Sequence, residues 1–363
     1  MAVYPGHNGD IYLDLFYSAL AVFGVQSSKL TIDKEWLRIN AERLDAIHIH
    51  WPEDIWRSWG RTNSSRLRGV IALLRFLRLS KRLGIKRIWT MHNLEQHEGV
   101  DWVDRWGYRV LARHSDMVIC HSQSAAEAIR RRDRPRGPLV VMRFGNFGAS
   151  YPEARPRALV LTELGLSPEL PMVCCVGHLR PYKGLNIVCE AVRMLGNQIQ
   201  LVIGGRPWSG FDLPALRDAV ESLPFGRVVD RWLSAQEFAD IVGASDAVIL
   251  PYHNITGSAA LFAAWGLGRG VIASDLPFFR ETISPEPDAG MLFRCGVGDS
   301  LADAIIEYLR IPPERRTAAA LRTMQQYSWE RCVQPVWEVI LEWSRAKACE
   351  ADLGHSMPRP VSP

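Results

Sequence analysis

The chain alternates short apolar runs with longer amphipathic stretches over most of its length, and this alternation constrains its fold most strongly. Apolar runs that end at polar or glycine-containing loops are typical of strands, and the stretches between them have the periodicity of helices. Strands that alternate with helices predict an α/β fold with parallel, doubly wound sheets. In such sheets the loops that follow the strands carry the functional groups.

The predicted strands fall into two groups, and 363 residues are enough for two hydrophobic cores. We therefore predict two Rossmann-like domains that face a cleft, the first at 1–150 and the second at 151–328. A tryptophan-containing helix at 329–348 would cross back to the first domain. We expect a disordered tail at 349–363, which contains three prolines.

One loop in the second half has the composition of a phosphate site. It begins at Gly177, directly after the apolar run 172–176, and reads GHLRPYKGL. It contains two cations, Arg180 and Lys183, and it leads into a predicted helix over 186–195. Cations and the free N–H groups of a helix N-terminus together attract a diphosphate. The alternative is an ordinary loop with solvated charges.

A second loop, 251–258, reads PYHNITGS and lies between the predicted strand 247–250 and a predicted apolar helix over 259–267. It offers hydroxyl groups and N–H groups at a helix N-terminus, with no negative charge to repel phosphate. A plain helix cap would explain the same composition, but two such loops on one sheet favour an anionic ligand between the domains. The residues we assign to this site are Asn254, Thr256, Gly257 and Ser258.

The loops of the first half carry the candidate catalytic residues. His92 follows the predicted strand 87–91, Glu98 lies in the same loop, and Asp10 lies in the loop after the first strand. A histidine or carboxylate at such a position can remove a proton from an acceptor hydroxyl. Metal binding is the alternative, but the spacing contains no helical H-x-x-x-H pair and no cysteine joins it. We therefore predict acid–base chemistry or acceptor binding, and no metal.

Residues 57–87 contain ten Lys and Arg residues and no Asp or Glu. Apolar residues recur within this stretch at helical spacing, and Trp51, Trp56 and Trp59 lie beside or within it. A basic amphipathic helix with flanking tryptophans suits the surface of an anionic membrane. A core helix with a solvated basic face explains the pattern equally well. RNA binding is less favoured, because no RNA-binding motif accompanies the cations.

The overall composition narrows the class of protein. A net charge of +4 does not indicate a nucleic-acid-binding protein. The seven cysteines show no metal-type spacing, so we expect reduced thiols. The N-terminal residues do not resemble a signal peptide, and no apolar run is long enough to span a membrane. We therefore expect a cytoplasmic location, with a peripheral position at the inner face of the cell membrane if the basic stretch binds lipid.

These motifs resemble the GT-B glycosyltransferases, in particular the group 1 or family 4-like transferases of bacterial exopolysaccharide synthesis. The resemblance is strongest at GHLRPYKGL and at 251–275, and it extends to the segments WTMHNLEQHE and VICHSQSA. It implies that Arg180 and Lys183 bind the donor diphosphate and that His92 lies near the reacting sugar. It implies no cofactor, because the nucleotide sugar is a substrate.

The chain departs from the retaining members of this group, which usually carry two glutamates eight positions apart. Ile255 and Ala263 stand at the corresponding positions, and neither side chain can accept a hydrogen bond. The loop is similar instead to a subgroup with an NITGS-like turn. Retention or inversion of configuration is left open. If the enzyme inverts, the general base must come from the first domain, with Glu98, Asp10 and His92 as candidates.

We therefore predict an enzyme that transfers a hexose from a GDP- or UDP-linked sugar to a hydroxyl of a glycan acceptor, with the acceptor bound to lipid. Exopolysaccharide or cell-surface glycan synthesis is the expected setting. Positive groups would stabilise the charge that develops on the leaving diphosphate. Two alternatives remain: a non-catalytic scaffold that binds sugar nucleotides, suggested by the missing glutamates, and a nucleotide-sugar epimerase of the same architecture.

Overall fold

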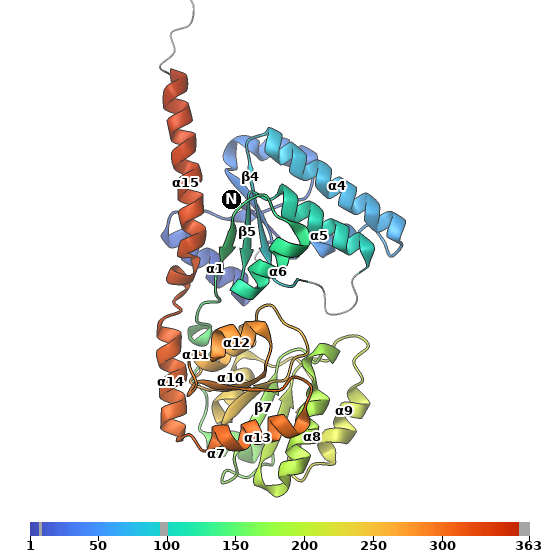
Figure 1. Ribbon diagram of the computed structural model, residues 1–363, viewed down its shortest axis with the longest axis vertical. Helices are drawn as coiled ribbons and strands as arrows, with labels where there is room; N and C mark the ends of the chain where they lie inside the picture. The colour runs from blue at the N-terminus through green and yellow to red at the C-terminus, as the bar shows by residue number, and fades with distance from the viewer. Residues whose placement is uncertain (7–8, 95–100, 356–363) are drawn as a thin grey trace, which may run out of the picture.

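The computed structural model describes residues 1–6, 9–94 and 101–355. The described residues form two six-stranded sheets, and every strand pair in them is parallel. Figure 1 shows the two sheets one above the other, each with its own helices. The predicted α/β architecture with two doubly wound sheets is therefore confirmed.

The N-terminal sheet has the strand order β2–β1–β3–β4–β5–β6. Its edge strand β2 is a two-residue exposed strand without an apolar run, which is why the sequence pattern did not predict it. The strands are β1 (Ala2–Tyr4), β2 (Ser28–Lys29), β3 (Ala46–Ile49), β4 (Lys86–Met91), β5 (Met117–Cys120) and β6 (Leu139–Val141). The helices are α1 (Ile11–Val22), α2 (Lys34–Asn40), α3 (Glu53–Arg57), α4 (Asn63–Arg82), α5 (Trp102–His114) and α6 (Gln123–Asp133).

The C-terminal sheet has the strand order β12–β11–β10–β7–β8–β9, so the direction of winding reverses between β7 and β10. The loops that follow these two strands therefore leave the sheet side by side. The strands are β7 (Met172–Val176), β8 (Gln200–Gly204), β9 (Gly226–Val229), β10 (Ala247–Leu250), β11 (Val271–Ser274) and β12 (Gly290–Phe293). The helices are α7 (Arg157–Glu163), α8 (Leu185–Leu195), α9 (Leu213–Glu221), α10 (Ala235–Ala244), α11 (Ala259–Gly266), α12 (Pro277–Ile283), α13 (Gly298–Leu309) and α14 (Pro313–Gln325).

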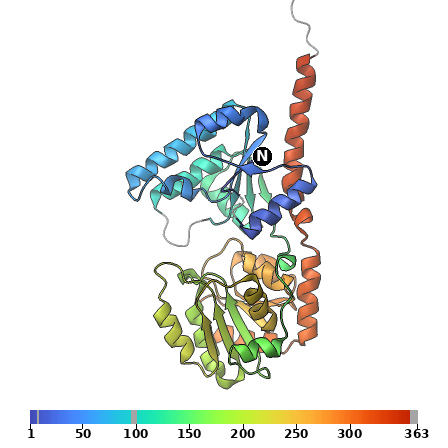
Figure 2. The same ribbon diagram turned by 180° about the vertical axis from the view of Figure 1, so that it is seen from behind.

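The last helix, α15 (Trp329–His355), runs beside the N-terminal half and packs along α1 (Figures 1 and 2). The indole N–H of Trp329 donates to the carbonyl of Asn146 at 2.9 Å. The rings of Phe23 and Trp337 stack with their centroids 5.7 Å apart. The helix continues beyond the predicted end at residue 348. Residues 349–355, expected in a disordered tail, are therefore helical, and residues 356–363 lie outside the described part of the chain.

One apolar core extends across both halves of the molecule. Phe144 and Phe147, in the segment that follows β6, lie at its centre. The ring centroid of Phe144 is 5.7 Å from that of Phe262 in α11, and the centroid of Phe147 is 5.3 Å from that of Trp329 in α15. Apolar packing therefore holds the halves together next to the loops that follow the strands.

Candidate functional site

The loops after β7 and β10 contact each other, because these strands are neighbours in the sheet. We call them the paired loops. The backbone N–H of His253 donates to the carbonyl of Tyr182 at 2.8 Å. Gly184 has a φ of +61°, and a Cβ atom at this position would lie 2.3 Å from the carbonyl oxygen of Pro251. Only glycine permits this approach. The two loops therefore meet at the reversal of strand order, where doubly wound sheets usually bind ligands.

The two cations of the loop after β7, Lys183 and Arg180, lie against different residues. Lys183 is buried, and its Nζ lies 5.5 Å from the ring centroid of Tyr252. A Cβ atom at Gly177 would lie 3.1 Å from the same Nζ. Burial is the main reason that the pKa of Lys183 falls to about 8, and the charge of Arg180 lowers it further. The Arg180 guanidinium itself stacks 3.9 Å from the ring centroid of Trp208, in the loop after β8.

The second loop turns toward the N-terminal half. The Thr256 hydroxyl donates to the carbonyl of His92 at 2.9 Å, and the Ser122 hydroxyl donates to the carbonyl of Thr256 at 3.2 Å. Ser258 caps α11 by accepting the N–H of Leu261 at 3.3 Å. The hydroxyls of Thr256 and Ser258, predicted to hold phosphate, are therefore both engaged within the protein.

The other two predicted residues of this loop differ in exposure. Asn254 is exposed to solvent. Gly257 lies against the first half, because a Cβ atom here would be 2.9 Å from the Phe144 ring and 3.2 Å from the Cβ of His121. The structure thus brings Gly177 and Lys183 together and places Arg180 on Trp208. It places Gly257 against the N-terminal half.

His92 lies directly after β4, half-buried between aromatic rings. Its ring stacks on Trp51 with the centroids 4.5 Å apart, and its Nε2 is hydrogen-bonded to Nδ1 of His50 at 3.0 Å. Burial, followed by the nearby His121 and His48, lowers the pKa of His92 well below 6.5. His92 is therefore neutral at pH 7, and it can accept a proton or exchange hydrogen bonds with a hydroxyl.

The two carboxylates predicted beside His92 have different outcomes. Asp10 is exposed, and its carboxylate caps α1 by accepting the N–H of Leu13 at 3.1 Å. The next residue, Ile11, lines a hollow of about 300 Å³ that also borders Gly177 and Gly205 of the C-terminal half. Asp10 therefore lies close to the space between the halves. Glu98 lies outside the described residues.

Two residues near His92 were not recognised in the sequence as part of a site. His121 follows β5 at the same edge of the sheet, and its Nδ1 donates to the carbonyl of Met142 at 2.9 Å. Its Nε2 is buried and has no hydrogen-bond partner among the described residues. Burial is the main reason that its pKa falls to about 4. The rule that selected His92, a histidine directly after a strand, also applies to His121. Tyr17 on α1 gave no such signal, because it follows the apolar pattern of a helix face.

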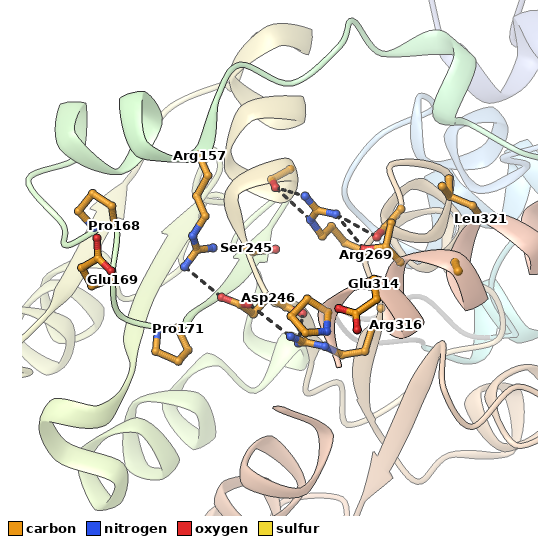
Figure 3. A pocket seen from close by; sticks show the side chains of 16 residues that line it. Arg157, Pro168, Glu169, Pro171, Ser245, Asp246, Arg269, Glu314, Arg316 and Leu321 are labelled. Carbon is orange, nitrogen blue, oxygen red and sulfur yellow. Dashed lines mark hydrogen bonds and ion pairs between the residues drawn. The ribbon is translucent and has the colours of Figure 1, made fainter. Parts of the chain in front are cut away.

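A larger hollow, of about 720 Å³, lies at the opposite edge of the C-terminal sheet, where β7 and β10 begin (Figure 3). Its arginines are held by acceptors within the protein. Arg157 and Arg316 lie 3.1 and 3.5 Å from the carboxylate of Asp246, and Arg269 donates to the carbonyl of Gly243. This charge is therefore used to anchor α14 and α7, and the hollow is separate from the paired loops.

Within the part of the chain that the structure describes, no group of three or more His, Cys, Asp or Glu side chains is arranged to hold a metal ion. The loops after β7 and β10 offer two cations and backbone N–H groups, and the imidazole of His92 lies across from them in the N-terminal half.

Residues 170–310 match the family model described as "Glycosyl transferases group 1". This region contains both paired loops. The two doubly wound sheets and the similar solved structures show the GT-B fold, and the match shows that residues 170–310 are similar to the group 1 glycosyltransferases. The resemblance predicted from the sequence motifs is therefore confirmed.

Known proteins of similar sequence and structure cover nearly the whole chain. The GDP-mannose:glycolipid 4-beta-D-mannosyltransferase of Xanthomonas campestris pv. campestris is 23% identical over 347 residues, which are 93% of this chain and 90% of that protein. HepE of Anabaena, solved in complex with UDP, has a TM-score of 0.70 at 16% identity and covers 94% of this chain and 100% of its own. Sucrose-phosphate synthase from Thermosynechococcus elongatus has a TM-score of 0.69 at 17% identity, with coverage of 95% and 96%.

Proposed function

We propose that the chain transfers a hexose from a GDP- or UDP-linked sugar to a hydroxyl of a glycan acceptor. The observation that carries this proposal is the contact between the loops after β7 and β10, with the cation Lys183 buried beside it. The named donor of the Xanthomonas relative is GDP-mannose, and HepE was also solved with UDP-glucose. Both names support a nucleoside diphosphate sugar as the donor.

In this proposal the donor diphosphate lies against the C-terminal half and the acceptor against the N-terminal half. The bond between the sugar C1 and the diphosphate oxygen breaks, and the acceptor oxygen forms a new bond to C1. Arg180 and Lys183 stabilise the negative charge that moves onto the diphosphate. His92 and Asp10 are the described candidates to bind the acceptor hydroxyl or take its proton, and Glu98 remains a third.

The first experiment screens nucleotide sugars by thermal shift, because a ligand that binds the folded state stabilises it. The stabilising donor is then supplied in radiolabelled form with a lipid-linked glycan acceptor. We expect transfer of the label, and we expect Lys183→Ala to lower kcat/KM on the order of a hundredfold. Lys347→Ala is the matched control, because Lys347 is exposed on α15 and pairs with Asp45.

The outcomes separate this proposal from its alternatives. A scaffold would bind the donor without transferring or hydrolysing it. An epimerase would interconvert the free donor without an acceptor, which a nuclear magnetic resonance time course would show. A normal rate in Lys183→Ala would contradict the role proposed for the loop after β7.

We further propose that the acceptor is lipid-linked and that α4 binds the anionic inner face of the membrane. The relative from Xanthomonas is named for a glycolipid acceptor. Three of the ten cations in 57–87 are paired: Arg57 and Arg66 with Asp104, and Arg87 with Asp116. Six others are exposed along α4 and the loop before it: Arg61, Arg68, Arg75, Arg78, Lys81 and Arg82.

The three tryptophans of this region do not form the membrane-facing group that the sequence suggested. Trp56 is fully buried, and its indole N–H donates to Asp104 at 2.7 Å. Trp51 stacks on His92. Trp59 is 52% exposed and is the one of the three that presents a large apolar surface. Among the described helices, none is both long enough and apolar enough to cross a bilayer.

Vesicle flotation tests the membrane proposal. We expect the protein to float with vesicles that contain anionic lipid and to remain unbound with neutral vesicles. Changing Arg75 and Arg78 together to Glu should abolish the binding. The same change at Arg131 and Arg134, which are exposed outside α4, should leave it intact. Flotation that does not depend on anionic lipid or on α4 would contradict the proposal.

A further inference from the structure

Five side chains at the edge of the N-terminal sheet form a continuous chain of hydrogen bonds that ends at His92. The Thr90 hydroxyl lies 2.8 Å from Nε2 of His48, and Nδ1 of His48 lies 2.7 Å from the hydroxyl of Tyr17. The same hydroxyl lies 2.8 Å from Nε2 of His50, and Nδ1 of His50 lies 3.0 Å from Nε2 of His92. The Tyr17 hydroxyl is therefore the link between the two pairs.

The hydrogen-bonded chain is buried, and burial favours the neutral form of an imidazole. The side chains of His48, His50, Thr90 and Tyr17 are each at most 3% exposed. Burial lowers the pKa of His48 to about 3 and raises the pKa of Tyr17 well above 10. A neutral imidazole carries a proton on one ring nitrogen and a lone pair on the other, and a phenol has one proton to donate.

Because each group has one proton to donate, all hydrogen bonds of the hydrogen-bonded chain run in the same donor-to-acceptor direction. If Thr90 donates to His48, then His48 donates to Tyr17, Tyr17 to His50, and His50 to Nε2 of His92. The proton of His92 is then on Nδ1. If the direction is reversed, His92 donates from Nε2 and carries its lone pair on Nδ1. A change of direction requires that every proton in the chain move, so the five groups must change together.

We propose that Tyr17 is a positioning residue that, through His50, holds the His92 imidazole in one tautomer and one orientation. The proposal rests on the role of His92 beside the reacting sugar. With Nε2 bonded to His50, Nδ1 is the ring nitrogen that remains for a substrate. The direction of the hydrogen-bonded chain thereby determines whether Nδ1 of His92 presents an N–H donor or a lone pair to the substrate. Stacking on Trp51 holds the plane of the ring, whereas the hydrogen-bonded chain holds its protonation.

The decisive measurement is the tautomer of His92 in the ligand-free protein, read from the nitrogen chemical shifts of ¹⁵N-labelled histidine rings. Signals of His92 are assigned with His92→Gln. We expect a single tautomer in the wild-type protein and a mixture of both in Tyr17→Phe, which removes the hydroxyl and leaves the ring. Thr90→Val removes the terminal hydroxyl without changing the shape of the side chain, and it should also produce a mixture. Thr90→Ser should retain the wild-type tautomer.

The kinetic consequence is a lower kcat with an unchanged KM for the donor, because the donor nucleotide is bound by the other half. We expect Tyr17→Phe to lower kcat about tenfold, the effect of losing one buried hydrogen bond. Tyr108→Phe is the control for stability. It removes another buried hydroxyl of the same half. This hydroxyl donates to Glu53 at 3.4 Å and is not part of the hydrogen-bonded chain that ends at His92. It should leave the tautomer of His92 and kcat unchanged.

Either of two tautomer measurements would overturn the proposal: a wild-type His92 that already populates both tautomers, or a Tyr17→Phe variant with the tautomer of the wild type. A change of the same size in Tyr108→Phe would also overturn it, because the effect would then follow stability alone. The nitrogen shifts do not depend on turnover. A wild-type protein that shows the tautomer effect but no transfer would therefore contradict the proposed function and leave the role of Tyr17 in place.

Discussion

Lys183 carries its charge at a position where a charge is costly. It is buried beside Tyr252, and desolvation is the main cause of its low pKa of about 8. A buried titratable group with a perturbed pKa in the ligand-binding region of a fold is a mark of function. A bound diphosphate would supply the opposite charge and compensate for the burial.

This burial makes a prediction about stability. The unfolded chain keeps the Lys183 proton up to about pH 10.5, whereas the folded protein loses it near pH 8. Below pH 8 the charged side chain therefore opposes folding, and between pH 8 and 10.5 the folded state gains stability as the pH rises. We expect Lys183→Met to raise the free energy of unfolding of the ligand-free protein by about 1–3 kcal/mol at pH 7.

Urea unfolding of wild type and Lys183→Met at pH 7 and pH 10 measures this difference. The advantage of the variant should shrink at the higher pH, where the wild-type lysine has lost its proton. An equal advantage at both pH values would show that the charge is not its source. Loss of activity in a more stable variant would identify Lys183 as a functional group that the fold tolerates.

At the scale of the elements, the close contact between the two paired loops depends on Gly184. It ends the short 3-10 turn Pro181–Lys183 and begins α8. Its left-handed conformation and its contact with the carbonyl of Pro251 both exclude a side chain. The loop that carries Arg180 and Lys183 is therefore held against the loop after β10.

We expect Gly184→Ala to lower the free energy of unfolding by about 3 kcal/mol, because it adds a steric clash to the strain of a left-handed alanine. Gly84→Ala is the matched control. Gly84 also has a positive φ, +74°, but a Cβ atom there would meet no atom within 4 Å. It should lose about 1 kcal/mol from strain alone. Equal losses in urea unfolding would mean that the two loops separate freely.

The basic stretch shows why the surroundings of an element cannot be read from its own residues. The acids that neutralise part of it, Asp101, Asp104 and Asp116, lie in or beside α5. The Trp56 indole is buried because Asp104 accepts its N–H group. These partners are set by how α3, α4 and β4 pack beside α5.

At the scale of the whole molecule, polar contacts join the halves beside the candidate site. The carboxylate of Glu281, in α12, accepts the N–H groups of Gln123 and Ser124 at 2.9 and 3.1 Å. It thereby caps α6 of the N-terminal half. The hydrogen bond from Thr256 to the carbonyl of His92 lies at the same seam. A carboxylate that accepts two N–H groups at a helix N-terminus is a strong contact.

We expect Glu281→Ala to loosen this seam, because two N–H groups lose their charged acceptor. Amide hydrogen exchange at the start of α6 should accelerate about tenfold, which corresponds to the loss of about 1.4 kcal/mol of protection. The value of kcat/KM should fall in parallel. Glu127→Ala is the control, because the ion pair of Glu127 with Arg131 stays within α6. Unchanged exchange in Glu281→Ala would show that apolar packing alone holds the halves together.

Several features of this protein follow from local sequence alone. The strand–helix alternation predicted both doubly wound sheets, and it located β7 and β10 with the residue bounds that the structure has. These features are predictable because apolar periodicity, helix caps and glycine turns act between residues that are close in the chain. The strand β12 was not predicted, although three of its four residues are apolar.

Other features depend on packing between distant segments. The order of the strands places the loops of β7 and β10 side by side, although more than 60 residues separate those strands. The halves meet so that Thr256 bonds to His92, and Tyr17 joins His48 to His50 because α1 packs on β3. Hydrogen bonds and burial depend on distances of a few ångströms, and these distances between remote segments exist only once the elements have packed together.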